Sequence, residues 1–226
     1  MPKKSTSRPD KSRSRILLVD DHPIVREGLE ARINQEPDLL VCGLAEDAHQ
    51  AMELISQLDP DLVITDLSLE GKPGLELVKD LERAHPSLPV IVLSIHDESL
   101  WAERVLLAGA EGYIMKSQAT QKVVDAIRQV LAGGIWVSER LNAILLQKLT
   151  RKSPKPMGSP LEQLSDRELE IFQMIGNGLS MREIAVKLYL SIKTVEVHRE
   201  HIKEKLGLKS STELIRYAVT HAMDSK

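Results

Sequence analysis

The stretch ILLVDD at residues 16–21 joins a short apolar run to two adjacent aspartates. Four further apolar runs follow at roughly even spacing: LLVCGLA (39–45), LVIT (62–65), VIVLS (90–94) and GYIM (112–115). Short runs of this kind are typical of strands buried on both faces of a sheet. The segments between them carry apolar residues at helical spacing. Because strand and helix alternate five times, we predict an α/β fold with a five-stranded, parallel, doubly wound sheet.

The composition indicates a soluble globular protein of one large or two small domains. The chain has 226 residues, of which 42% are hydrophobic and 28% charged, and it lacks an uncharged apolar run of the ~18 residues that a membrane-spanning helix needs. Its single cysteine, Cys42, cannot form an internal disulfide. The basic N-terminus lacks the apolar stretch of a secretory signal. We therefore expect a cytoplasmic protein with no membrane partner.

Charge is distributed unevenly along the chain. Residues 1–15 have a net charge of +5, residues 16–139 of -13, residues 140–160 of +5, and residues 161–226 are neutral. The basic segment 140–160 also contains prolines and glycine, which is linker composition. The breaks in charge and composition predict four parts: a disordered basic tail (1–14), the α/β domain (15–133), a linker with an amphipathic helix (134–160) and a C-terminal domain (161–226).

Helix-start signals recur in the C-terminal domain. The sequences SDRE (165–168) and SMRE (180–183) both have the form of a capping box, in which a serine and a glutamate satisfy the first backbone amides of a helix. A third helix is expected after Ser191 and a fourth after Ser211. The sequence therefore predicts an all-α domain of four helices.

Polar residues end the predicted strands. Asp20 and Asp21 follow the first strand, Asp66 ends the third, Ser94 ends the fourth and Lys116 follows the fifth. The carboxyl ends of parallel strands meet at one sheet edge, where such folds bind ligands. Three close carboxylates repel one another, and a bound Mg²⁺ would relieve the repulsion while leaving room for a phosphate oxygen. We expect a magnesium and phosphoryl site at this edge.

The motifs ILLVDDHPIVREGL, DLVITDLSLEGKPGLEL, VIVLS and GYIMK resemble the receiver domain of two-component response regulators, over about residues 15–133. The segment LSDRELEIFQMIGNGLSMREIAVKLYLSIKTVEVHREHIKEKLGL resembles the LuxR-type helix-turn-helix of NarL/FixJ regulators, over about residues 161–223. The first resemblance implies a flavodoxin-like sheet, and the second implies DNA binding. Together they imply a regulator of transcription rather than an enzyme.

The receiver resemblance assigns roles to the polar strand ends. Asp66 would accept a phosphoryl group from a sensor histidine kinase. The magnesium would be held by Asp21, Asp66 and the backbone carbonyl of Ser68, with help from Asp20. Ser94 and Lys116 would contact the transferred phosphoryl group. Tyr113 would either fill the space that Ser94 leaves or serve only as a packed strand aromatic.

The helix after Ser191 is the expected DNA reader. On a helical wheel Val195, Ile202 and Leu206 face inward, so the opposite face is free to enter the major groove. Phosphate contacts are expected from Lys193, Thr194 and Lys203, and base contacts from Glu196, Val197 and Glu200. The net charge of +3 over residues 180–210 suits only weak binding by one copy. We expect a homodimer on a roughly palindromic duplex.

Two alternative functions use the same residues. An aspartate-nucleophile phosphatase would use the acidic pocket for turnover, but position 68 holds serine where a second aspartate is expected. A constitutive DNA binder would use the α/β domain only as a phosphate-independent interaction module. A phosphodonor experiment on Asp66 distinguishes the three.

Overall fold

The computed structural model contains the predicted five-stranded sheet. It describes residues 13–69, 71–150 and 159–224, so most of the predicted basic tail and residues 151–158 of the predicted linker lie outside the described residues. The strands are β1 (Ser14–Val19), β2 (Leu39–Ala45), β3 (Leu62–Asp66), β4 (Val90–Ser94) and β5 (Gly112–Met115). They are all parallel, in the order β2-β1-β3-β4-β5. The flavodoxin-like α/β prediction is confirmed.

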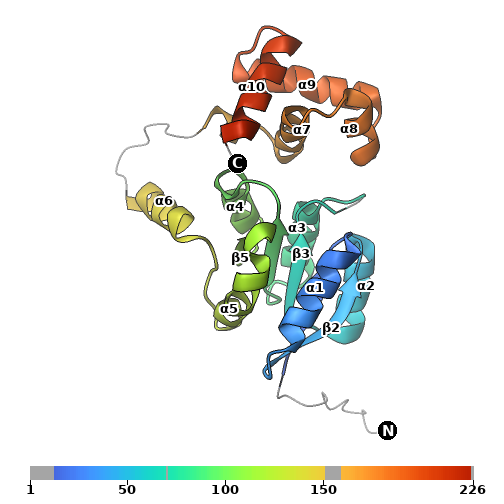
Figure 1. Cartoon of the computed structure of the whole chain (residues 1–226), viewed down its shortest axis with the longest axis vertical. Coiled ribbons are helices and arrows are strands. Elements are labelled where there is room, and N and C mark those ends of the chain that lie inside the picture. The colour runs from blue at the N-terminus through green and yellow to red at the C-terminus, as the bar shows by residue number, and fades with distance from the viewer. Residues whose placement is uncertain (1–12, 70, 151–158, 225–226) are drawn as a thin grey trace. The chain divides into compact units, whose positions relative to one another are not determined.

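Helices cover both faces of this sheet (Figure 1). They are α1 (Pro23–Asn34), α2 (Ala48–Leu58), α3 (Gly74–Ala84), α4 (Glu98–Leu107) and α5 (Ala119–Leu131). On one face, Ile16 and Ile64 of the sheet form a buried core with Ile33 of α1 and with Val123 and Ile127 of α5. Burial on both faces explains why the strands are continuous apolar runs rather than alternating ones.

Strand order reverses at β1. This strand pairs with β2 on one side and with β3 on the other. The chain therefore leaves β1 and β3 in opposite directions across the sheet, which opens a crevice beyond their carboxyl ends. The loops that start at Asp20 and Asp66 both face this point.

The first compact unit extends beyond the predicted boundary at residue 133. It comprises residues 1–147, and a second unit comprises residues 148–226. Trp136 forms a parallel bridge with Gly112 of β5, and its backbone exchanges hydrogen bonds with Glu111 and Tyr113 at 2.8 and 2.9 Å. The predicted amphipathic helix is present as α6 (Glu139–Thr150). The start of the predicted linker is thus paired to the sheet edge.

Residues 159–224 of the second unit contain four α-helices preceded by a short 3₁₀ turn, η2 (Pro160–Gln163). They are α7 (Asp166–Gly176), α8 (Met181–Lys187), α9 (Ile192–Leu206) and α10 (Ser211–Asp224). The capping boxes predicted at the starts of α7 and α8 are both formed. The Ser191 hydroxyl accepts a hydrogen bond from the Thr194 amide at 3.0 Å and so caps the start of α9.

The fourth helix begins one residue earlier than predicted. Its first residue is Ser211, and the hydroxyl of Ser210 accepts the Glu213 amide at 3.2 Å. Two serines are adjacent in the sequence, and the first is the one that precedes the helix, where a cap hydroxyl can accept a first-turn amide.

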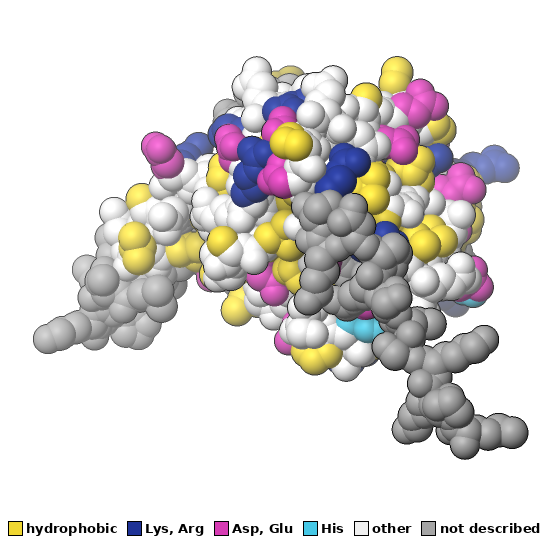
Figure 2. Space-filling view, turned by 90° about the horizontal axis from the view of Figure 1, so that it is seen from below, with side chains coloured by type: hydrophobic (Ala, Val, Ile, Leu, Met, Phe, Trp, Pro, Cys, Tyr) yellow, Lys and Arg dark blue, Asp and Glu magenta, His cyan; other side chains and the backbone are white. Residues whose placement is uncertain are grey.

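The surface carries charges of both signs. Figure 2 shows one face of the molecule, on which basic side chains lie beside acidic ones. The negative first unit contains such pairs: Arg128 of α5 donates to Glu36 at 2.7 Å and to Asp38 at 2.7 and 2.9 Å. Among the described residues, no helix has the length and apolar character needed to cross a bilayer.

Candidate phosphoryl-acceptor site and nucleic-acid interface

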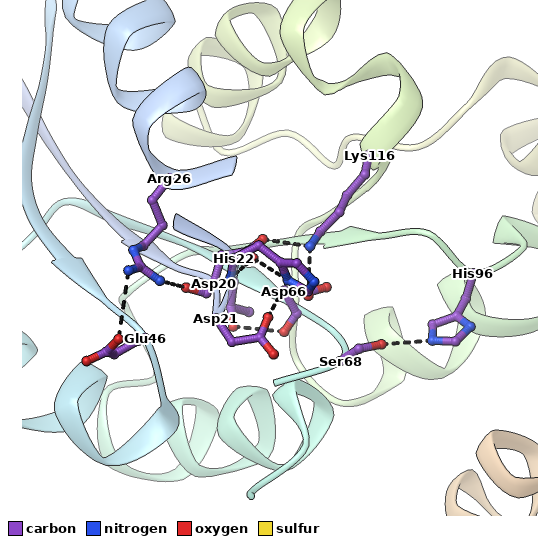
Figure 3. A network of polar contacts seen from close by, with 10 residues as sticks. Asp20, Asp21, His22, Arg26, Glu46, Asp66, Ser68, His96 and Lys116 are labelled. Carbon is purple, nitrogen blue, oxygen red and sulfur yellow. Dashed lines mark hydrogen bonds and ion pairs between the residues drawn. The ribbon is translucent and has the colours of Figure 1, made fainter. Parts of the chain in front are cut away.

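Four side chains from two strand ends gather at the crevice. Asp20, Asp21 and His22 follow β1, Asp66 ends β3, and one ligand atom from each lies within 4.8 Å of the others. Figure 3 shows these side chains turned toward one another. The carboxylates of Asp20 and Asp66 are only 3% and 2% exposed, whereas that of Asp21 is 18% exposed. Water can therefore reach the cluster mainly from the Asp21 side.

Lys116 is a cation that contacts two carboxylates of this cluster. It follows β5, and its Nζ lies 2.7 Å from Oδ2 of Asp20 and 2.8 Å from Oδ2 of Asp66 (Figure 3). Burial alone would lower the pKa of Lys116, but attraction to Asp66 and Asp20 outweighs it and raises that pKa. Burial raises the pKa of Asp66, and Lys116 offsets only part of this effect. The lysine thus stays charged beside a carboxylate that lacks full compensation.

The remaining charge and donor geometry fit a hard divalent cation. Lys116 pairs with two of the three carboxylates, and Oδ1 of Asp66 is buried without a hydrogen-bond partner among the described residues. Carboxylate oxygens are the ligands that Mg²⁺ prefers. Asp20, Asp21 and Asp66 could hold such an ion together. Ser68 adds a backbone hydrogen bond that lowers the pKa of Asp66.

The other predicted phosphoryl contacts meet at His96, a residue that the sequence did not assign. Ser94 is fully buried, and its Oγ accepts the His96 amide at 2.9 Å. The Tyr113 hydroxyl donates to the His96 carbonyl at 2.8 Å, and Nε2 of His96 lies 2.8 Å from Oγ of Ser68. Tyr113 is 1% exposed. The loop after β4 thus joins three predicted site residues through one histidine.

A close backbone approach shapes the loop after Asp66. Gly74 begins α3, and a Cβ at this position would lie 1.9 Å from the carbonyl oxygen of Asp66. A side chain would displace the strand end that carries the acidic group. Glycine at 74 is therefore required by the site.

The helix predicted to read DNA is α9, and its inward and outward residues can be compared with the helical wheel. In α9, Val195 and Ile202 are buried and Leu206 is half-buried. The predicted DNA contacts are exposed or half-buried on the opposite side: Lys193, Thr194, Glu196, Val197, Glu200 and Lys203. Lys203 lies 2.7 Å from Oε2 of Glu200, so two of these contacts form an ion pair with each other.

Comparison with known proteins assigns both units. Residues 16–128 match the response regulator receiver domain, and residues 162–218 match the bacterial regulatory proteins of the luxR family. The chain belongs to the NarL/FixJ response regulators. Members of this family are transcription regulators, which confirms the expectation of a regulator rather than an enzyme.

Relatives of this response regulator align along nearly their whole length. The response regulator GacA of Pseudomonas aeruginosa is 37% identical over 92% of this chain and 97% of its own. The oxygen regulatory protein NreC of Staphylococcus carnosus is 34% identical over 91% and 96%. RcsB of Salmonella enterica serovar Typhimurium, solved on the promoter rprA with the phosphomimetic BeF₃⁻, is 29% identical over 91% and 98%, with a TM-score of 0.66.

Two further residues of the response regulator support the acidic cluster. The backbone amide of His22 donates to Oδ1 of Asp20 at 2.9 Å, and its ring Nδ1 lies 2.5 Å from Oδ1 of Asp21. Arg26 of α1 donates to the Asp20 carbonyl and lies 3.8 Å from Oε2 of Glu46 (Figure 3). The sequence signal was the placement of His22 immediately before Pro23, where α1 begins.

Proposed function

We propose that this response regulator is switched by phosphorylation of Asp66. A sensor histidine kinase supplies the phosphoryl group, and the modified receiver unit promotes pairing of two chains and sequence-specific binding to double-stranded DNA. This switching takes place in the cytoplasm, where kinase output and DNA meet. The observation that supports the proposal most directly is the carboxylate of Asp66: its Oδ2 pairs with the ammonium of Lys116, while its buried Oδ1 has no partner in the described part of the chain.

The residues divide the chemistry among them. A carboxylate oxygen of Asp66 attacks the phosphorus of the kinase phosphohistidine, the P–N bond breaks, and an acyl phosphate forms. Such transfer asks a protein mainly to position the groups and to neutralise the phosphoryl oxygens. Lys116 already lies beside the acceptor and contributes positive charge. Ser94 supplies a hydroxyl at the neighbouring strand end.

Magnesium fits the remaining donors. Asp21, Asp66 and the Ser68 carbonyl would hold it, with Asp20 assisting. When bound, the ion neutralises oxygens of the incoming phosphoryl group. The 18% exposure of Asp21 leaves an approach for the ion from solvent.

The new phosphate can shift the surrounding loops. Each hydrogen bond to a charged group is worth about 1.5–3 kcal/mol, and moving a two-state balance from 1:99 to 99:1 requires about 5.5 kcal/mol. Two or three new contacts therefore suffice. Ser94 and Ser68 both contact His96, whose carbonyl holds Tyr113, so movement of Ser94 toward the phosphate disturbs all three residues.

DNA binding is assigned to α9 and to two copies of the chain. The phosphate contacts proposed are Lys193, Thr194 and Lys203, and the base contacts are Glu196, Val197 and Glu200. A net charge of +3 over residues 180–210 gives one copy little affinity. A structure of two RcsB dimers on two DNAs, which is 29% identical with a TM-score of 0.63, supports pairing on DNA.

The test measures phosphorylation of each protein and then the DNA sequences that the same protein selects. Wild-type protein, Asp66→Ala and the surface control Asp125→Asn are incubated with acetyl phosphate and Mg²⁺, and their intact masses are measured. Each is then equilibrated with a pool of random duplexes, and the bound fraction is sequenced. We expect one phosphoryl group on the wild type and the control, with enrichment of one palindromic sequence, and neither result for Asp66→Ala.

Two other outcomes contradict the proposal. Equal enrichment by all three proteins, with or without phosphodonor, identifies the receiver unit as a phosphate-independent module. A phosphoryl group on Asp66→Ala places the acceptor elsewhere.

A further inference from the structure

We propose that the DNA-binding unit contains a site for a divalent transition metal, formed by Glu168, His198 and His201. One ligand atom from each of these residues lies within 4.8 Å of the others. Glu168 belongs to α7, and both histidines belong to α9. The inference is independent of the phosphoryl site, which lies in the other unit.

The fold itself fixes the carboxylate. Glu168 is the third residue of α7, and its Oε2 accepts the Ser165 amide at 2.7 Å in the capping box. The same oxygen lies 2.6 Å from Nζ of Lys205. Its side chain is 5% exposed. The Ser165 amide on Oε2 leaves Oε1 facing the histidines, and an outer partner of this kind orients a carboxylate toward a metal.

The two histidines complete the set from one face of α9. His198 and His201 are three residues apart, so they are neighbours on the helix surface. Nδ1 of His201 lies 3.8 Å from Oε1 of Glu168. His198 is half-buried, whereas the His201 side chain is 52% exposed. The exposed imidazole of His201 is the donor with room to move toward a shared ion.

The donor chemistry selects the kind of cation. Two imidazoles and one carboxylate are the protein ligands of open zinc sites, in which water takes the fourth position. Imidazole suits Zn²⁺, Ni²⁺ and Cu²⁺, whereas Mg²⁺ and Ca²⁺ prefer oxygen donors. The exposed side of His201 leaves space for that water. We therefore use Zn²⁺ as the probe.

Lys205 opposes binding and supplies a diagnostic variant. Its ammonium is paired with Oε2 of Glu168 and repels an incoming cation. Removal of this charge in Lys205→Met tightens Zn²⁺ binding several-fold if the ion binds at Glu168. Loss of a merely structural ion pair would not increase metal affinity.

A bound ion would connect the start of α7 to the middle of α9. These helices already pack together, and Val195 and Ile202 of α9 are fully buried. Metal binding to the folded unit adds stability by mass action. The stability of the helix that carries the proposed DNA contacts would then depend on Zn²⁺.

Calorimetric titration of the full chain with Zn²⁺, in excess Mg²⁺ to occupy the acidic cluster of the first unit, tests the site. We expect Glu168→Gln and His201→Asn each to weaken one binding event at least about tenfold. Glutamine can still complete a capping box, so Glu168→Gln preserves the fold. His49→Asn removes an exposed histidine of α2 and serves as the control with unchanged affinity.

Imidazole NMR signals locate the ion. We expect the signals of His198 and His201 to shift on addition of Zn²⁺, while circular dichroism shows the same helix content in all variants. The proposal is overturned if these signals stay in place at saturating Zn²⁺, or if His201→Asn binds as tightly as the wild type.

Discussion

At the scale of single residues, the acidic cluster lowers the stability of the folded chain. Asp66 is buried beside Asp20, and Lys116 is shared between the two carboxylates. Burial raises the pKa of Asp66, which means that its charged form is less favourable in the folded chain than in water. The charge that would make it a phosphoryl acceptor therefore destabilises the apo protein.

The first prediction concerns the neutral isostere of this residue. Asp66→Asn removes one of three close negative charges, so we expect a higher Tm without Mg²⁺, by about 3 °C if the repulsion is worth about 1 kcal/mol. Wild-type protein should gain stability from Mg²⁺, about 2.7 kcal/mol at a hundredfold excess over Kd, and the variant should lose most of that gain. Differential scanning calorimetry measures both effects.

Asp125→Asn is the control for that experiment. It removes the same charge from an exposed position of α5 and should change neither the Tm nor its response to Mg²⁺. A lower Tm for Asp66→Asn in the absence of Mg²⁺ would show that the lost ion pair with Lys116 outweighs the repulsion among the carboxylates.

The second prediction concerns the surface cluster around Arg128. Hydrogen bonds from Arg32 and Arg128 lower the pKa of Glu36 below its ordinary value of 4.5, and one from Arg128 lowers that of Asp38 below 3.8. A lowered folded-state pKa adds stability above the unfolded-state value, and this stability is lost as the pH falls through the folded-state value. The pairs should stabilise the protein at pH 7 and cease to do so in acid.

Arg128→Gln should therefore lower the urea midpoint at neutral pH, with a deficit that shrinks once the pH falls below about 4.5. The effect is small because the cluster is exposed and water screens it. Lys122→Gln on the same helix provides the control. A deficit that stays constant down to acid pH would exclude the ion pairs as its cause.

At the scale of helices and strands, the third prediction distinguishes two adjacent serines. Ser210 Oγ accepts the Glu213 amide at the start of α10, whereas Ser211 is the first helical residue. We expect Ser210→Ala to destabilise α10 by about 1 kcal/mol and Ser211→Ala to have little effect. Hydrogen exchange of the α10 amides measures the difference. A larger effect of Ser211→Ala than of Ser210→Ala would show that Ser211 is the cap.

Elements with a local signal were predictable. The four later strands coincide with the apolar runs to within one residue, and the two capping boxes place α7 and α8. The first strand is longer than its apolar run because Ser14 and Arg15 pair with Leu39 and Leu40 of β2. The bridge from Trp136 to β5 also depends on pairing between distant segments, which no local pattern specifies.

The same distinction holds for the site. Convergence of Asp20, Asp66 and Lys116 follows from strand ends meeting at one edge, so sequence alone predicts it. The roles of His22 and His96 depend on how two loops fold back, with contacts of 2.5 and 2.8 Å that involve specific ring atoms. Loop conformations of this kind are set by the whole crevice, not by neighbouring residues.

At the scale of the whole molecule, the two units differ in charge balance. Residues 16–139 carry a net charge of -13, which suits an acidic metal site and disfavours contact with DNA phosphates. Residues 161–226 are neutral overall, with a local excess of +3 over residues 180–210. DNA affinity should therefore come from few phosphate contacts and depend on how many chains bind together.

The last prediction uses salt dependence to count those chains. The logarithm of the affinity falls with the logarithm of salt concentration by about 0.9 per neutralised phosphate. Lys193→Ala should therefore reduce the slope by about 1.8 if two chains bind one duplex, but by about 0.9 if one chain binds. The Lys193 side chain is exposed on α9, whereas Lys203 is already paired with Glu200, so Lys203→Ala should change the slope less. Fluorescence anisotropy on the selected duplex, with phosphorylated wild-type protein, the two variants and Lys122→Ala as the control, gives the four slopes. An unchanged slope for Lys193→Ala would remove this lysine from the interface, and a change near 0.9 would establish binding by a single chain.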